Sequence, residues 1–165
     1  GSGKSTIFNI ITGGVRPNAG TVSFAGTEIT HRSVHHRCRM GIGRSYQIPH
    51  PFAKMTVFEN LLVGAVFGGS RREAEGQEIC HQVLAETGLL AKANVLAGAL
   101  TLLERKRLEL ARALATRPRL LLLDEIAGGL TEHECLELVE TILDHTYVLG
   151  SIIPLVEGFF KGVEK

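Results

Sequence analysis

The first six residues constrain the fold more than any other stretch, because they match the second half of a phosphate-binding loop. The loop pattern is G-x-x-x-x-G-K-S/T, and the residues that fit its end are Gly1, Ser2, Gly3, Lys4, Ser5 and Thr6. Glycine has no Cβ, so backbone N–H groups can approach phosphate oxygens closely. In such a loop Lys4 supplies an ammonium group to the β- and γ-phosphates, and the Ser5 hydroxyl suits Mg²⁺. Because the pattern starts before residue 1, we expect the sequence to be a fragment that lacks its natural N-terminus.

The residues that follow this loop predict a helix. Apolar side chains recur at helical spacing, and a glycine pair then predicts the helix end, at Ile7, Phe8, Ile10, Ile11 and Gly13-Gly14. The unpaired N–H groups and positive dipole end of this helix would face the phosphates. A flexible Gly/Ser-rich tag or linker is the alternative interpretation of so short a motif. An apolar strand ending in aspartate elsewhere in the chain would favour the phosphate loop.

Such a strand is predicted at residues 120–125, where four leucines are followed by Asp124 and Glu125. A continuous apolar run is typical of a strand that is buried on both faces. Ligands bind at the carboxyl ends of such strands in open α/β sheets. Asp124 is therefore placed to reach Mg²⁺, directly or through water, and Glu125 to orient or deprotonate an attacking water. The alternative is a pair of acids at a helix N-terminus, but the phosphate loop in the same chain favours the functional interpretation.

The remaining elements are predicted from the spacing of apolar residues and from residues that favour turns or helix ends. Short strands are expected at 21–26 and 41–47, and the second ends in the polar residue Gln47 before two prolines force a loop. Helices are expected over 55–62, 71–90 and 102–115, with a loop at 91–99, so the chain from about 55 to 115 is helical. Thr56 with Glu59, and Thr131 with Glu134, match the capping box that begins a helix. In the helix that begins after Thr131, Leu136 is expected to face inward.

Composition excludes several functional classes. The 165 residues carry a net charge of +1, which gives no case for nucleic acid or an anionic membrane surface as a partner. The three cysteines are far apart and odd in number, so we expect no disulfide framework and a reducing cytoplasm. No signal peptide and no run long enough to span a bilayer is visible.

A cluster of three histidines and a cysteine is a conceivable metal site, at His31, His35, His36 and Cys38. A solvated surface helix or loop is the favoured interpretation of this polar, basic stretch, because no carboxylate or second cysteine completes a ligand set.

The order of these motifs resembles an ABC-type ATPase. The resemblance rests on the phosphate loop, Gln47 after a strand, the helical insert with a signature-like helix start, the strand that ends in Glu125, and a glycine-rich loop at 128–131. Residues 41–60 and 107–116 more closely resemble the ATP-binding subunits of branched-chain amino-acid importers. The likeness covers about residues 1–150. It implies an α/β P-loop NTPase fold: a RecA-like core with a mainly parallel sheet from residues 1–54 and 116–165, its N-terminal strands missing, and an inserted helical, signature-bearing subdomain at 55–115.

The resemblance also implies the roles of individual residues, with ATP and Mg²⁺ as the bound species. Lys4 and the backbone of residues 1–6 would hold the phosphates, Ser5, Gln47 and Asp124 would ligate Mg²⁺, and Glu125 would act on the attacking water. Such proteins pair with a second ATP-binding subunit, and the signature segment of each subunit contacts the nucleotide held by the other. In this chain, Thr101 is the signature residue that would make this contact in trans. They drive integral membrane permease subunits from the cytoplasmic face of the plasma (inner) membrane.

Several positions depart from the family pattern. The signature resembling L-S-G-G-Q reads Leu100, Thr101, Leu102, Leu103 and Glu104 here. Thr101 can replace the serine hydroxyl, whereas the two following leucines replace glycines that allow close approach to the γ-phosphate. The usual proline after the catalytic glutamate is Ile126, the usual acid of the next loop is Thr131, and the switch histidine is Gly158.

Three other interpretations stay open, and the departures in the signature and the switch position motivate the first of them. One is a degenerate module that binds ATP without turning it over. Another is a small P-loop kinase, which the helical insert ahead of the acidic strand disfavours. The third is a marginally folded fragment, because lost N-terminal strands would expose a sheet edge.

Overall fold

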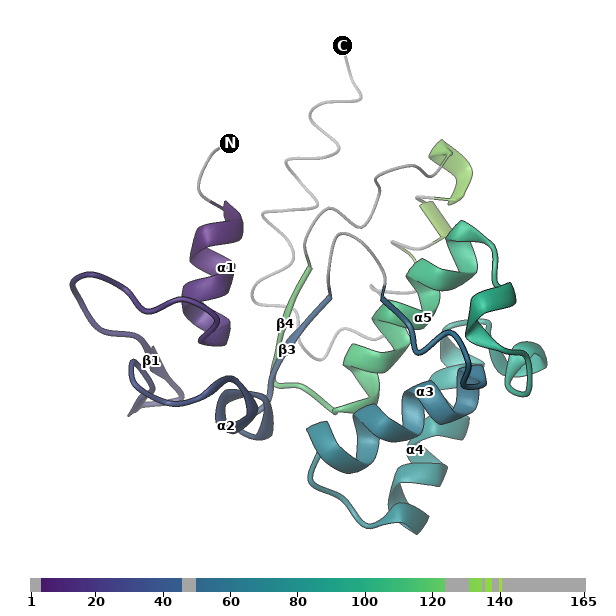
Figure 1. Cartoon of the computed structure of the whole chain (residues 1–165), viewed down its shortest axis with the longest axis horizontal. Helices are drawn as coiled ribbons and strands as arrows, with labels where there is room; N and C mark the ends of the chain where they lie inside the picture. Colours follow the sequence, from purple (N-terminus) through teal and green to yellow (C-terminus); the bar gives the residue numbers. More distant parts are fainter. Residues whose placement is uncertain (1–3, 46–49, 124–130, 135, 138–139, 141–165) are drawn as a thin grey trace.

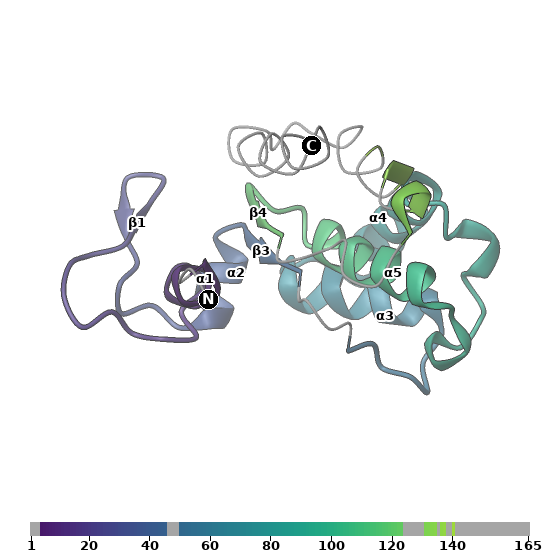
Figure 2. The same cartoon turned by 90° about the horizontal axis from the view of Figure 1, so that it is seen from above.

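The computed structural model describes residues 4–45, 50–123, 131–134, 136–137 and 140. Two groups of elements lie side by side (Figures 1 and 2). One group combines helices with short strands: α1 (Lys4–Thr12), β1 (Ser23–Phe24), β2 (Thr27–Glu28), α2 (Val34–Arg39), β3 (Ile42–Arg44) and β4 (Leu120–Leu122). The other is helical: α3 (Val57–Val63), the π-helix η1 (Gly64–Gly68), α4 (Glu73–Glu86), the 3₁₀ turns η2 (Leu90–Lys92) and η3 (Ala97–Ala99), and α5 (Leu102–Ala115).

The parallel pair β3–β4 lies between α1 and the helical group (Figure 1). Ile42 pairs with Leu120, and Arg44 with Leu122. Parallel neighbours require a long crossover connection, which here contains the whole helical group. Buried Ile29, Ile42 and Leu122 form a small apolar cluster against which α1 packs.

The helical group has its own core. Most of its buried residues come from α3, α4 and α5, and Leu61, Val83 and Leu108 are fully buried. Leu121 and Leu123 reach the same cluster, so the strand β4 is packed against both cores. Helices α3 and α5 approach closely at Gly64, where a Cβ atom would lie 2.9 Å from the carbonyl oxygen of Arg112.

Most predicted elements are confirmed, with changes in length. The helices at 4–12 and 102–115 and the capping box of Thr56 with Glu59 are as expected. The helix predicted over 71–90 is shorter, and the loop predicted at 91–99 contains 3₁₀ turns. The strand expected at 21–26 is only two residues long and forms a hairpin with β2, because Ala25 and Gly26 both adopt positive φ, as a tight two-residue turn requires.

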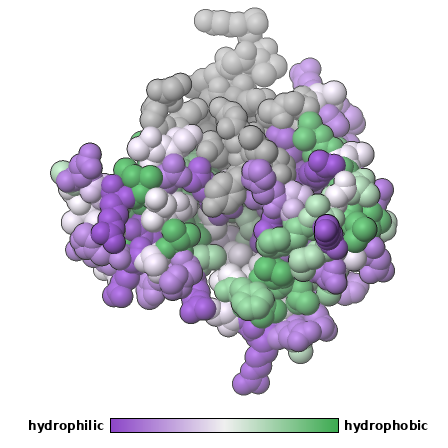
Figure 3. Space-filling view, viewed as in Figure 1, coloured by the Kyte–Doolittle hydropathy of each residue, from purple (hydrophilic) through white to green (hydrophobic). Residues whose placement is uncertain are grey.

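The surface mixes polar and apolar side chains, with apolar residues gathered over the helical group at the right of Figure 3. Phe67 is the most exposed large apolar side chain of the described residues. Phe52 is half-buried, and the guanidinium carbon of Arg112 lies 4.9 Å from its ring centroid. No helix in the described part of the chain is long and apolar enough to cross a membrane.

Candidate functional site

The candidate phosphate site lies at the N-terminal end of α1. The helix begins at Lys4, and Ser5 and Thr6 are exposed in its first turn. This turn itself contains no acidic residue, so no carboxylate of its own neutralises the positive end of the helix dipole. An exposed helix start with free N–H groups and a serine hydroxyl suits a phosphate with its bound cation.

The carboxyl ends of the two parallel strands lie on the same side as this helix start (Figure 1). Pairing continues past β3, since the N–H of Ser45 donates to the carbonyl of Leu122 at 3.0 Å. Gln47 follows β3 by three residues and Asp124 follows β4 by two. The two strands that precede these predicted metal ligands therefore end on the same side of the sheet.

Several predicted site residues lie outside the described residues. These are Gly1, Ser2, Gly3, Gln47, Asp124 and Glu125. Their roles remain predictions that rest on the sequence, whereas Ser5, Thr6 and Thr101 are placed.

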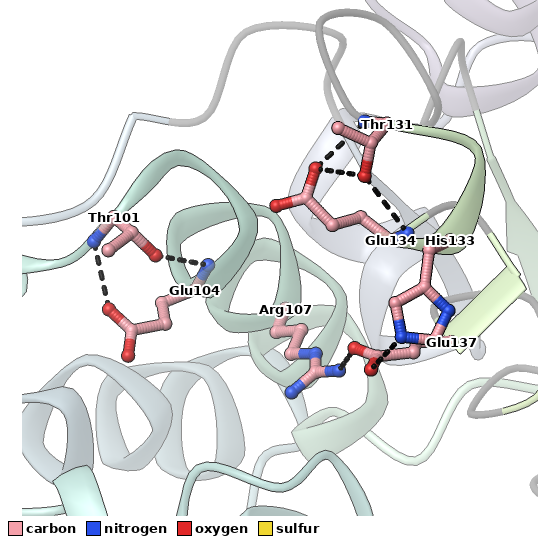
Figure 4. A network of polar contacts seen from close by, with 7 residues as sticks. All are labelled: Thr101, Glu104, Arg107, Thr131, His133, Glu134 and Glu137. Carbon is pink, nitrogen blue, oxygen red and sulfur yellow. Dashed lines mark hydrogen bonds and ion pairs between the residues drawn. The ribbon is translucent and has the colours of Figure 1, made fainter.

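Thr101 is the N-cap residue of α5 (Figure 4). Its Oγ1 accepts a hydrogen bond from the N–H of Glu104 at 3.3 Å, and the Glu104 carboxylate accepts from the N–H of Thr101 at 2.9 Å. Glu104 also contacts the ammonium of Lys92 at 3.2 Å, which partly neutralises the charge that replaces the usual glutamine. A hydroxyl that accepts a bond can still donate its own hydrogen, so exposed Thr101 keeps the chemistry needed to contact a phosphate.

A third capping box follows the acidic strand in the sequence. Thr131 Oγ1 accepts from the N–H of Glu134 at 3.3 Å, and the Glu134 carboxylate accepts from the N–H of Thr131 at 2.8 Å. Arg107 of α5 pairs with Glu137 of this segment (Figure 4). The helix that starts at Thr101 is thus tied to the segment that follows Asp124 and Glu125. Leu136, expected to face inward, is instead 43% exposed.

The capping boxes predict how stability depends on pH. Backbone hydrogen bonds from Thr56, Thr101 and Thr131 hold the pKa values of Glu59, Glu104 and Glu134 below the usual range. Each pKa is lower in the folded chain, so the unfolded chain binds more protons once the pH nears the ordinary glutamate value of about 4.3. The stabilisation is present above that value and is lost as the pH falls through the lower, folded values.

The test is to measure urea midpoints from pH 7 to pH 3 for the chain and for Glu104→Gln. Glutamine keeps an acceptor oxygen but does not titrate, so we expect a shallower fall in stability with acid. Glu78→Gln, at an exposed position on α4, is the matched control and should keep the original slope. An unchanged slope for Glu104→Gln would show that the cap does not contribute to acid sensitivity.

The histidine cluster is not a metal site in the described residues, because no group of three possible ligands is found there. His31, His35 and His36 are exposed, and the thiol of Cys38 faces the carbonyl of Gly68 at 3.8 Å. The expectation of a solvated surface is right for these histidines and wrong for Arg37, which is only 2% exposed. Nothing in the local pattern signals that burial, since its partners lie far away in the sequence.

The chain is similar to a known protein family and to several of its members. The sequence profile of the ABC transporter family matches residues 1–128. The chain is 34% identical to the high-affinity branched-chain amino acid transport ATP-binding protein BraF of Pseudomonas aeruginosa, over 96% of this chain and 77% of that protein. It is also 34% identical to the corresponding protein LivG of Escherichia coli, over 98% of this chain and 69% of that one.

A solved structure of the ADP conformation of an ATP-binding cassette of an ABC transporter matches with a TM-score of 0.77 at 31% identity. The match covers 87% of this chain, which spans only 61% of the solved cassette. The expected P-loop NTPase fold and the resemblance to importer ATPases are confirmed by these matches, and nothing in them favours a degenerate module or a kinase.

Proposed function

Because the chain belongs to the ABC transporter family, we propose that it binds and hydrolyses ATP to power an importer for branched-chain or related amino acids. One observation carries the proposal: the exposed start of α1 and the carboxyl ends of β3 and β4 lie on one side of the molecule. Such an arrangement supports a site where helix N–H groups and the residues that follow the two strands would meet the same ligand. The names of the two relatives support the choice of solute.

The residues around this edge fit a nucleotide with Mg²⁺. The exposed Ser5 hydroxyl is an oxygen ligand of the kind that Mg²⁺ prefers, and Gln47 and Asp124 would add two more. The cation would neutralise charge on the β- and γ-phosphates. Lys4 would bind those phosphates together with the backbone of residues 1–6. Glu125 would orient the attacking water and accept its proton as the water attacks the γ-phosphorus, while the bond from that phosphorus to the β,γ-bridging oxygen breaks and ADP leaves.

The partners follow from the same proposal. A second ATP-binding subunit would complete each nucleotide site, with the exposed helix start at Thr101 facing the partner's nucleotide. Permease subunits in the plasma membrane would bind the pair from the cytoplasmic side. The transported amino acid would contact those subunits rather than this chain.

The proposal is tested by calorimetric titration of the chain with Mg-ATP. We expect binding by the chain and at least about tenfold weaker binding by Lys4→Ala, because a charged contact to phosphate is lost. Lys54→Ala removes an exposed lysine of the described residues and should bind as the unmodified chain does. Absence of binding by the unmodified chain, shown to be folded by circular dichroism, would contradict the proposal.

A further inference from the structure

Positive and negative side chains are distributed unevenly along this chain. Residues 1–54 contain seven lysines and arginines and a single acid, Glu28. Residues 55–115 contain seven lysines and arginines and seven acids, and residues 116–165 contain four and nine. The net charge of +1, from which we expected no anionic partner surface, therefore conceals a strongly basic first part. Such an asymmetry of charge is typical of chains that contact a polyanion or a membrane surface.

The exposed positive charge of this first part is concentrated at α2 and in the turn before it. Five exposed side chains there are arginine or histidine: His31, Arg32, His35, His36 and Arg39. We call these five residues the α2 basic surface. A histidine is either neutral or positively charged, so none of the three histidines opposes the charge of the two arginines.

The buried Arg37 fixes the position of this surface. Its side chain is 2% exposed, and its guanidinium donates to the carbonyls of Ile10 at 2.6 Å and Ile11 at 2.8 Å in the last turn of α1. It also donates to the carbonyl of Thr30 at 2.9 Å. A buried charge that lost these acceptors would be costly. Helix α2 is therefore held against α1 by Arg37, with the α2 basic surface exposed to solvent.

No acidic side chain neutralises the α2 basic surface among its neighbours in the described residues. Helix α2 packs mainly against α1, β3 and η1, and none of these elements contains an aspartate or glutamate. The side chains of Arg32 and Arg39 form no ion pair with the described residues, and neither does Glu28, the nearest acid in the sequence. The described acids of residues 131–140 lie on the far side of the molecule from α2 (Figures 1 and 2). The two arginines are thus available to an anion outside the chain.

The α2 basic surface is separate from the candidate phosphate site. Helix α2 packs on the C-terminal end of α1, whereas the candidate phosphate site is at the N-terminal end (Figure 1). Because α1 has nine residues, its two ends lie about 13 Å apart. That separation exceeds the Debye length of about 10 Å at 0.1 M salt, so a bound nucleotide would leave most of the charge at α2 unopposed.

An exposed valine adds an apolar side chain to this basic surface. Val34 is the first residue of α2, is 49% exposed, and precedes His35 and His36. Basic side chains around an exposed apolar one suit the headgroup region of a bilayer, where charge and apolar area both contribute to binding. The phosphate backbone of a nucleic acid offers the valine no apolar counterpart.

We propose that the α2 basic surface binds the anionic headgroups of a lipid bilayer and so orients the chain on the membrane. The choice of a lipid surface over another polyanion rests on the proposed function, which places the chain beside permease subunits in the plasma membrane. The cytoplasmic leaflet of such a membrane is negatively charged and attracts basic side chains near its surface.

The test measures binding of the chain to vesicles by flotation, with phosphatidylcholine alone and with equal parts of phosphatidylcholine and phosphatidylglycerol. We expect binding to the anionic vesicles only, and its loss as salt rises from about 0.05 M to about 0.5 M, because salt screens the attraction. Arg32→Gln combined with Arg39→Gln should weaken binding about 25-fold, since each arginine near an anionic leaflet contributes about a fivefold factor.

A second double variant is the matched control. Lys54→Gln combined with Arg72→Gln removes two exposed charges away from α2, one of them beside Glu73, and should weaken binding less than about threefold. All four substitutions are at exposed positions, so both double variants should keep the melting temperature of the unmodified chain.

Four results would overturn the inference: equal weakening by the two double variants, equal binding to neutral vesicles, binding of single-stranded RNA without binding of anionic vesicles, and self-association in light scattering without vesicle binding. The titration with Mg-ATP separates these failures from failure of the proposed function. If the chain binds Mg-ATP and Lys4→Ala does not, but anionic vesicles are not bound, only the inference is wrong. If anionic vesicles are bound through Arg32 and Arg39 but Mg-ATP is not bound, only the proposed function is wrong.

Discussion

Replacement of Glu125 by glutamine is expected to slow ATP hydrolysis by about 10²- to 10⁴-fold, the usual contribution of a general base. Glutamine has nearly the same shape but cannot accept the proton of the attacking water. Binding of Mg-ATP should be retained, because Lys4 and Ser5, rather than Glu125, are assigned to the phosphates and the cation. The measurement is phosphate release at saturating Mg-ATP, with the chain assembled with the second ATP-binding subunit and the permease subunits that are proposed as its partners.

Glu132→Gln provides the matched control for this variant. Glu132 is an exposed carboxylate in the helical turn that follows Thr131, close to Glu125 in sequence, and its loss should leave turnover unchanged. Equal turnover by Glu125→Gln and the unmodified assembly would remove Glu125 from the mechanism. Binding without measurable turnover by the unmodified assembly would instead favour the degenerate module.

Local signals in the sequence predicted the helix starts well. Thr56 with Glu59, and Thr131 with Glu134, form the expected reciprocal bonds, because a capping box needs only residues three positions apart. The start of α1 was predictable from the contiguous phosphate-loop motif. The nature of the candidate site also followed from local motifs, since the phosphate loop and the acidic strand end are each contiguous.

Contacts between distant residues could not be predicted in this way. Arg37 binds carbonyls that lie 26 and 27 positions earlier, so its neighbours in the sequence suggested a solvated stretch. The π-helix η1 likewise depends on packing, since Gly64 and Gly68 lie against α5 and Thr116. Parallel pairing of β3 with β4 spans the whole helical group; the resemblance to a known fold predicted a mainly parallel sheet but not this pair.

Substitution of a buried polar residue in the helical group is expected to lower the free energy of unfolding substantially. Asn60 is fully buried, and its side-chain oxygen accepts from the N–H of Phe52 at 2.9 Å. Its amide nitrogen contacts the carbonyls of Phe52 at 3.1 Å, Thr56 at 2.8 Å and Met55 at 3.4 Å. One side chain thus holds the loop that leads from the sheet into α3.

Asn60→Ala is expected to lower the free energy of unfolding by about 3 kcal/mol, since each buried group left unsatisfied costs about 1–3 kcal/mol. That is a large share of the roughly 5–15 kcal/mol that stabilises a domain. Urea unfolding followed by circular dichroism measures the change as a lower midpoint. Asn94→Ala, at an exposed position of the same helical group, is the control and should shift the midpoint little. A loss below about 0.5 kcal/mol, the range of ordinary surface substitutions, would show that water replaces the amide and that the loop is held by other contacts. A loss of the expected size would show that the bonds from Asn60 to the segment before α3 contribute a large share of the stability of the helical group.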